Sequence, residues 1–376
     1  MTDRPSRAGW QNGSDPAVGC AFSRTHTNRR VLLLTGLAGL VASAASLGAG
    51  RVGAAVALSF FRIGTGSTEG TYYPVGGLIA SAISNPPGSR PCERGGSCGV
   101  PGLIAVAQST SGSVENVMAI SAGHLESGFS QADVAYWAST GTGVFAGKGA
   151  LPNLSAIANL YPEAMHLVVR REAGMRRPGD LRGRRVSLDR EGSGSRVDAL
   201  LVLEAYGLRP SDMEALETSP QEAADLLTEG KLDAFFMVVG TPAPVIEDLA
   251  NESLITLIPI EGPDAEALSA KYPFFSKDAI HSGTYFNVPY TPTLSVGAQW
   301  LVGADIPEDE VYAITRALWH ESTRRLLDSG HPKGKLIRIE TALDGLGVPL
   351  HPGAERYYRE RGLLDGASPS VGPESG

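Results

Sequence analysis

The chain has 376 residues, of which 42% are hydrophobic and 19% charged, and its formal net charge at pH 7 is −8. This composition allows a buried core, and the length favours two lobes or domains. An acidic balance without a compensating basic stripe, together with only 7% aromatic residues, argues against nucleic acid as a partner.

The first 57 residues have the features of an export signal. A basic region ends at Arg29-Arg30, an apolar run rich in Ala, Leu and Gly follows, and small residues of the form Ala-x-Ala stand at Ala55 and Ala57. The apolar run is too short and too rich in glycine for a membrane span. We therefore expect cleavage near Ala57 and a soluble, exported protein. The paired arginines leave the twin-arginine and the general secretory routes both open.

Two cysteines follow the signal, Cys92 and Cys98, in a Gly-rich loop. An exported protein meets oxidising conditions, which allow this pair to form a small disulfide ring. The alternative is a metal site, which needs further Cys or His ligands close by, and the nearest histidine in the sequence is His124. We expect the disulfide and no metal.

From residue 60 onward, short apolar runs alternate with segments of helical periodicity, which predicts an α/β fold. The predicted strands lie at 61–66, 103–110, 125–131, 154–161, 164–171, 185–189, 232–239, 254–260 and 292–303, and the predicted helices begin near 72, 113, 196, 219, 241 and 308. The helix that begins at 308 is expected to run unbroken to 322, and the tail at 366–376 is expected to be disordered.

Three loops of small polar residues each follow a strand and precede a helix. Amides in the first turn of a helix have no intrahelical acceptor and carry partial positive charge, so they bind carboxylate or phosphate. One such loop alone is more often a helix cap. Three of them favour a shared cleft between two lobes, lined by Ser67, Thr68 and Thr71, by Ser111, Gly112 and Ser113, and by Ser193 and Ser195.

Other functions that use such loops do not fit the sequence. A phosphate-binding P-loop needs a lysine after its last glycine, and none lies between Phe61 and Ser84. The spacing of Gly64, Gly66 and Gly70 is one residue too long for a dinucleotide fingerprint. The loop GSGSR lacks the closing glycine of the nucleophile elbow Gly-x-Ser-x-Gly, and GSTEG has Thr68 in the nucleophile position. The histidines show no pairing at metal-ligand spacing. We expect a binding protein without a cofactor, and not an enzyme.

Several segments taken together resemble the solute-binding subunits of the TAXI branch of tripartite ATP-independent periplasmic (TRAP) transporters. They are IGTGSTEGTYYPVGG, SGSVENVMAI, LYPEAMHLVVR, DLRGRRVSLDREGSGS, LDAFFMVVGTPAP and VYAITRALW, in this order, and the similarity extends from about residue 60 to residue 331. The resemblance implies a two-lobed, type II periplasmic-binding fold whose lobes close on a small carboxylate. Ligands in that family are glutamate-like amino acids and related dicarboxylates, and the closed form docks on a membrane permease.

The family pattern, transferred position by position, gives a set of expected ligand-binding residues. They are Ser67, Thr71, Tyr72, Ser113, Asn116, Gln131, Tyr161, Ser193, Gly194, Ser195, Thr241 and Pro242. The sequence departs from the family at Ser67 and Glu69, where glycine is frequent, and at Ser195, where threonine is frequent. If Glu69 faced the cleft it would repel a carboxylate, so it points to solvent or the ligand also carries a cation.

The expected division places residues 58–163 and 261–329 in the first lobe and residues 164–260 in the second lobe. Residues 330–365 form a C-terminal extension. We expect a monomer that delivers its ligand to TRAP permease subunits. Two alternatives stay open: a receptor that signals to a membrane sensor kinase, and an enzyme on the same fold.

Overall fold

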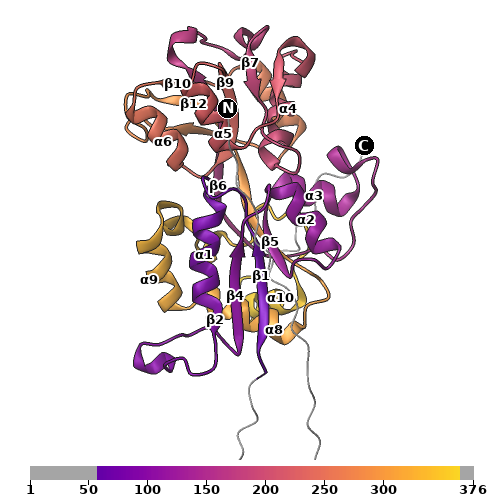
Figure 1. Cartoon of the computed structure of the whole chain (residues 1–376). Helices are drawn as coiled ribbons and strands as arrows, with labels where there is room; N and C mark the ends of the chain where they lie inside the picture. The colour runs from indigo at the N-terminus through magenta and orange to yellow at the C-terminus, as the bar shows by residue number, and fades with distance from the viewer. Residues whose placement is uncertain (1–56, 365–376) are drawn as a thin grey trace, which may run out of the picture. The chain divides into compact units, whose positions relative to one another are not determined.

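A computed structural model describes residues 57–364 (Figure 1). The predicted tail and all of the predicted export signal except its last residue lie outside this range. The strands are β1 (Ser59–Gly64), β2 (Ser84–Asn85), β3 (Val100–Pro101), β4 (Leu103–Gln108), β5 (Ser127–Gln131), β6 (Ser155–Arg170), β7 (Arg185–Ser187), β8 (Glu214–Leu216), β9 (Ala234–Val239), β10 (Ile255–Ile258), β11 (Ser276–Ile280) and β12 (Thr291–Val302). The α-helices are α1 (Tyr72–Ile83), α2 (Ser113–Ser121), α3 (Ala132–Thr140), α4 (Gly194–Ala205), α5 (Pro220–Thr228), α6 (Pro244–Asn251), α7 (Pro263–Lys271), α8 (Glu308–Leu318), α9 (Glu321–Gly330) and α10 (Pro352–Glu360). Within the described range, no helix combines the length and apolarity that crossing a membrane requires.

The main sheet contains two parallel halves joined by two long antiparallel strands. Its order is β4-β1-β5-β12-β6-β9-β7-β8, with β10 beside β6 and β11 beside β12. β1 is parallel to β4 and β5, and β7 is parallel to β8 and β9, whereas β6 and β12 run antiparallel to their neighbours. The half with β4, β1 and β5 is called the first lobe here, and the half with β9, β7 and β8 the second. The predicted two-lobed α/β fold is confirmed.

The chain passes between the lobes in β6 and β12. Two separate strands were expected at 154–161 and 164–171, and this expectation is wrong, because β6 is continuous over 16 residues. Its first part pairs with β12 from Ser155 opposite Val302, and its second part pairs with β9 from Ala164 opposite Val239. Pairing with β12 and then β10 along one side and with β9 along the other keeps the strand extended through the crossover.

The first lobe packs around a row of aromatic rings. The rings of Tyr72 and Phe129 lie 5.4 Å apart, those of Phe129 and Trp300 lie 6.4 Å apart, and both pairs meet edge to face. The C-terminal segment joins the same core, because Tyr358 is buried there and its hydroxyl donates to the Ile157 carbonyl at 3.0 Å. In Figure 1, α9 lies beside α1 on this lobe.

The second lobe has a core on each face of its sheet. Successive residues of β6 point to opposite faces, so Leu167 and Val169 enter one core and Val168 enters the other. The first of these cores also takes in Leu268 of α7 and Phe275 next to β11. The expected division assigned that segment to the first lobe, whereas its apolar side chains pack with those of the second.

The helix expected from 308 to 322 is interrupted. α8 ends at Leu318, and a new helix, α9, begins at Glu321. His320 between them has an extended backbone, with φ −72° and ψ 148°, and its Nδ1 accepts a hydrogen bond from the Ser322 amide at 3.1 Å. A histidine ring therefore caps the second helix, a role that helical periodicity does not reveal.

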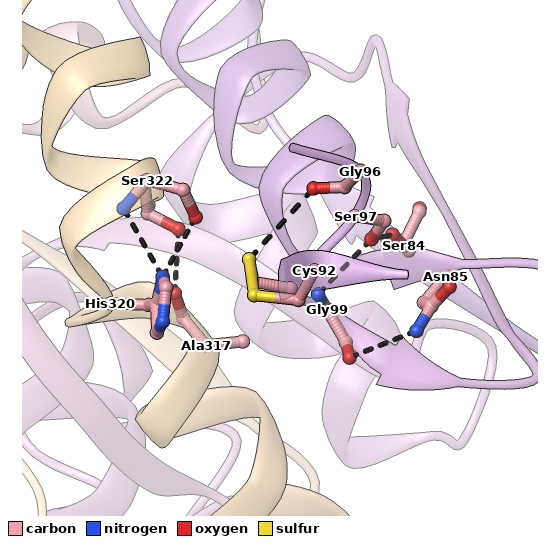
Figure 2. Close-up of a disulfide and its surroundings, with 11 residues drawn as sticks. Ser84, Asn85, Cys92, Gly96, Ser97, Gly99, Ala317, His320 and Ser322 are labelled. Carbon is pink, nitrogen blue, oxygen red and sulfur yellow. Dashed lines mark hydrogen bonds between the residues drawn. A yellow bond between two sulfur atoms is a disulfide. The ribbon is translucent and has the colours of Figure 1, made fainter. Parts of the chain in front are cut away.

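The predicted disulfide between Cys92 and Cys98 is formed, with an S–S distance of 2.04 Å. Figure 2 shows the disulfide within the β2–β3 loop, facing the start of α9, where His320 lies. One ligand atom from each of Cys92, Cys98 and His320 falls within 4.8 Å of the others. The sequence could not place this histidine beside the cysteines, because more than 200 positions of the chain separate them.

Candidate functional site

A cavity lies where the starts of α1, α2 and α4 meet the end of β9. The space open to the centres of water-sized molecules is about 50 Å³, and one water needs about 10–15 Å³ of such space. The cavity therefore has room for a small solute. Its lining consists of Gly66, Ser67, Gly70, Thr71, Tyr72, Ser111, Gly112, Ser113, Gln131, Glu163, Asp189, Ser193, Gly194, Ser195, Pro220, Met237, Val238 and Val239.

Each of the three helix starts presents a free amide to this cavity. The first residues of α1, α2 and α4 are Tyr72, Ser113 and Gly194, and all three line it. Within residues 57–364 their backbone N–H groups have no hydrogen-bond acceptor, as expected of the first turn of a helix. At α4, the Ser193 hydroxyl caps the next amide, that of Ser195, at 3.1 Å. The cavity thus collects unpaired donors that carry partial positive charge.

The two lobes touch around the cavity. The Glu115 amide of the first lobe donates to the Gly192 carbonyl of the second at 3.1 Å, and the Thr71 hydroxyl donates to the Gly240 carbonyl at 2.8 Å. Gly194 lies so close to the side chain of Gln131 that a methyl group there would overlap with it. The structure is therefore a closed arrangement of the lobes.

Eight of the twelve expected ligand-binding residues line the cavity, and four do not. The eight are Ser67, Thr71, Tyr72, Ser113, Gln131, Ser193, Gly194 and Ser195. Tyr161 is buried behind the lining, and Thr241-Pro242 is a cis peptide beyond the end of β9. The fourth is Asn116. Glu69 is also absent from the lining, and its carboxylate accepts a hydrogen bond from the Thr68 hydroxyl.

Asn116 connects the loops behind the cavity. Its side-chain amide donates to the carbonyls of Thr65 at 2.6 Å and Phe129 at 2.8 Å, and its oxygen accepts from the Thr110 hydroxyl at 2.8 Å. The side chain is fully buried. These partners lie just before the first two loops and on β5, so Asn116 fixes the positions of the loops and has no polar atom left for a ligand.

The sequence did not predict two acidic residues of the lining, Glu163 and Asp189. Asp189 lies in the loop between β7 and α4, where its carboxylate accepts from the Ser193 hydroxyl at 2.7 Å and from the Arg190 amide at 2.8 Å. Burial raises the pKa of Asp189. Glu163 follows Pro162 in the middle of β6 and is 3% exposed. Glu163 belongs to the segment LYPEAMHLVVR, but nothing local in the sequence indicated that this residue lines a cavity.

Comparison with known proteins identifies the family. The sequence pattern of the NMT1-like family matches residues 63–362. The chain belongs to the NMT1-like family. Its structure is similar to that of MatC from Rhodopseudomonas palustris with bound malate, at 15% identity over 82% of this chain and 98% of that chain, with a TM-score of 0.47. It is also similar to PhnD1 from Prochlorococcus marinus in complex with methylphosphonate, at 13% identity over 81% of this chain and 99% of that chain, with a TM-score of 0.46. It is similar as well to the alkanesulfonate-binding protein SsuA from Xanthomonas axonopodis pv. citri bound to MOPS, at 15% identity over 74% of this chain and 82% of that chain, with a TM-score of 0.41.

In this NMT1-like protein a pair of carboxyl groups lies between the lobes behind Gln131. Asp133 is on α3 in the first lobe and Asp198 is on α4 in the second, and both are buried. The Gln131 amide donates to Asp198 Oδ2 at 2.8 Å. Burial raises the pKa of Asp133 to about 6, and burial together with the charge of Asp133 raises that of Asp198 well above its usual range. Asp198 therefore keeps its proton and can donate it to Asp133 across the lobe contact.

We predict that Gly194→Ala holds the lobes apart. The new Cβ would overlap with the Gln131 side chain and lie 2.7 Å from Ser113 Oγ, both in the opposite lobe. Small-angle X-ray scattering should show a larger radius of gyration with unchanged unfolding. Gly77→Ala, in α1, is the matched control, because a methyl group there meets nothing within 4 Å. An unchanged radius for Gly194→Ala would show that closure does not depend on this contact.

We predict that Asn116→Ala lowers the free energy of unfolding by about 2–4 kcal/mol, because buried carbonyls lose their donor. Urea denaturation measures the loss. Asn251→Ala, at an exposed position of α6, should change stability by less than about 0.5 kcal/mol. Equal effects of the two substitutions would contradict the structural role of Asn116.

We predict that Asp198→Asn alters the pH dependence of stability. A carboxyl whose pKa is raised on folding costs stability as the pH rises from its unfolded value through its folded value, here from about 4 through about 6 for Asp133 and higher for Asp198. Asparagine cannot ionise, so the variant should gain on the order of 1–3 kcal/mol relative to the wild type between about pH 5 and about pH 8. Urea unfolding at both pH values tests this.

Asp225→Asn, exposed on α5, is the control for that experiment and should follow the wild type. A parallel pH profile for Asp198→Asn would mean that the two carboxyl groups do not share a proton.

Proposed function

We propose that this chain is a periplasmic solute-binding protein that captures a small carboxylate by closure of its two lobes. The observation that supports this most directly is the convergence of three helix starts on one small cavity, two from the first lobe and one from the second. A carboxylate placed there accepts hydrogen bonds from both lobes at once. The function needs no covalent step.

Capture follows from the difference in affinity between the open and the closed arrangement. In the open arrangement a ligand reaches the donors of one lobe, and in the closed arrangement it reaches those of both. The ligand stabilises the closed form by this difference alone. The paired strands β6 and β12 supply the continuous connection about which the lobes move.

The chemistry of the cavity supports binding in preference to catalysis. Within the described residues its lining offers hydroxyl groups, amides and two carboxyl groups, but no lysine, arginine, histidine or cysteine. Ser193 donates to Asp189, and Ser195 accepts from the Val238 amide at 2.9 Å, so both hydroxyls already have protein partners. Neither is arranged beside a histidine base as a nucleophile would be.

The proposed ligand class and transport partner rest on the sequence motifs that resemble the TAXI branch. It proposes a glutamate-like amino acid or a dicarboxylate as ligand and a TRAP permease as the recipient. Genes for large and small permease subunits beside this gene would support delivery, and a histidine kinase gene would support sensing instead.

A thermal-shift screen of L-glutamate, L-aspartate, succinate and malate tests the proposed function. Binding to the folded state alone raises its stability by about 2.7 kcal/mol at a hundredfold excess over Kd. The wild type should shift with at least one carboxylate, whereas Gly194→Ala should shift little and Gly77→Ala should match the wild type. If no carboxylate shifts the wild type, the proposed function is wrong.

A further inference from the structure

Glu163 occupies a distinctive place in the cavity. It lies in the middle of β6, where the strand passes from one lobe to the other, and its side chain lines the cavity although only 3% of the residue is exposed. The groups beside its carboxyl are the hydroxyl of Tyr72 and the backbone amide of Gly240. Both can donate to a carboxyl oxygen, so the proton of the acid form is left for an acceptor in the cavity.

The groups around Glu163 come from five elements. They are the hydroxyls of Tyr72 on α1 and Tyr161 on β6, the carboxyls of Asp133 on α3 and Asp198 on α4, and the ammonium of Lys333 in the 3₁₀ helix η6 (Pro332–Leu336). Asp189 lines the same cavity from the second lobe. The hydroxyls of Tyr72 and Tyr161 are buried and have no partner within the described residues. Tyr72 itself lines the cavity and is 7% exposed.

Lys333 is the cation that acts on Glu163, and its charge is shared. Its Nζ donates to the Pro162 carbonyl at 3.1 Å. The charge of Lys333 is attracted by two carboxyl groups, those of Asp278 and Glu163. Burial outweighs this attraction and raises the pKa of Glu163 to about 8. At neutral pH the carboxyl group therefore holds its proton and is a hydrogen-bond donor.

We propose that Glu163 contacts the bound anion as a protonated carboxylic acid and donates a hydrogen bond to it, so that the protein captures a carboxylate only while Glu163 is protonated. The inference rests on the proposed function and adds to it a residue that selects for anions. Tyr72 and the free amides of the helix starts supply further donors on the same cavity. An ionised Glu163 repels the ligand, so affinity falls as the proton is lost.

The opposite role for Glu163 is an ionised partner of a ligand ammonium group. It is disfavoured, because three helix starts direct partial positive charge at the same cavity. The two roles also differ in the sign of proton exchange. A carboxylic acid that donates to an anion takes up a proton on binding at high pH, whereas a carboxylate that pairs with an ammonium releases one.

The test is isothermal titration of succinate and L-glutamate into the wild type and Glu163→Gln between about pH 7 and about pH 9.5. Glutamine keeps a donor and cannot ionise. The ratio of wild-type to Glu163→Gln affinity should fall about thirtyfold across this range, in proportion to the protonated fraction of Glu163. Because the ratio compares two proteins at the same pH, it cancels titration of the ligand. Glu69→Gln, outside the cavity lining, should follow the wild type.

A second measurement needs no variant. Titration of the wild type near pH 9 in two buffers of different ionisation enthalpy should show uptake of close to one proton per bound ligand. Release of a proton, or a constant affinity ratio, overturns this inference and leaves the proposed function standing. If neither probe binds at any pH and the thermal-shift screen also finds no carboxylate, the proposed function falls and this inference falls with it.

Discussion

The pairing of β6 with β12 is the constraint on which the rest of the structure depends. Each strand runs through both lobes, and the pair is covered on one side by β5 and on the other by β9. Pro162 lies opposite Gly297, and the register shifts between Ala298 and Gln299. The irregularity lies opposite Tyr161 and Asn159, a few residues before Glu163. The crossover between the lobes and an acidic residue of the cavity lining therefore belong to the same short stretch of chain.

Burial, more than any ion pair, sets the electrostatics of this region. Charged pairs such as Arg62 with Glu126, 2.6 Å apart, lie away from the cavity, partly exposed. Around the cavity, Asp133, Asp198 and Glu163 are withdrawn from water, and the pKa of each is raised. The neutral forms of these acids avoid the cost of burying like charges together. They also leave the partial charges of the helix starts as the main field inside the cavity.

The features that depend on local chemistry could be predicted from the sequence. A strand, a loop of small polar residues and a helix form a local pattern that can be recognised in the sequence alone. Of the residues that this pattern marked in the three loops, Ser67, Thr71, Ser111, Gly112, Ser113, Ser193 and Ser195 line the cavity. The features that depend on contacts between distant segments could not. Asn116 has the polarity of a ligand-binding residue, yet partners on three other segments occupy it. Glu163 reaches the cavity only because β6 continues through a proline that seemed to end a strand. His320 caps a helix that periodicity could not separate from the one before it.

Under the proposed function, the closed arrangement also explains how capture of an anion is selective. In the closed arrangement, the Tyr72 hydroxyl and the amides of Ser113 and Gly194 have no acceptor among the described residues. Each unsatisfied buried polar group costs about 1–3 kcal/mol, so an empty cavity opposes closure. A bound anion supplies several acceptors at once and removes this cost, whereas a solute without acceptors does not. In the proposed function, the unpaired donors that destabilise the closed form without a ligand are therefore the groups that bind the anion, and only a ligand with matching acceptors favours closure.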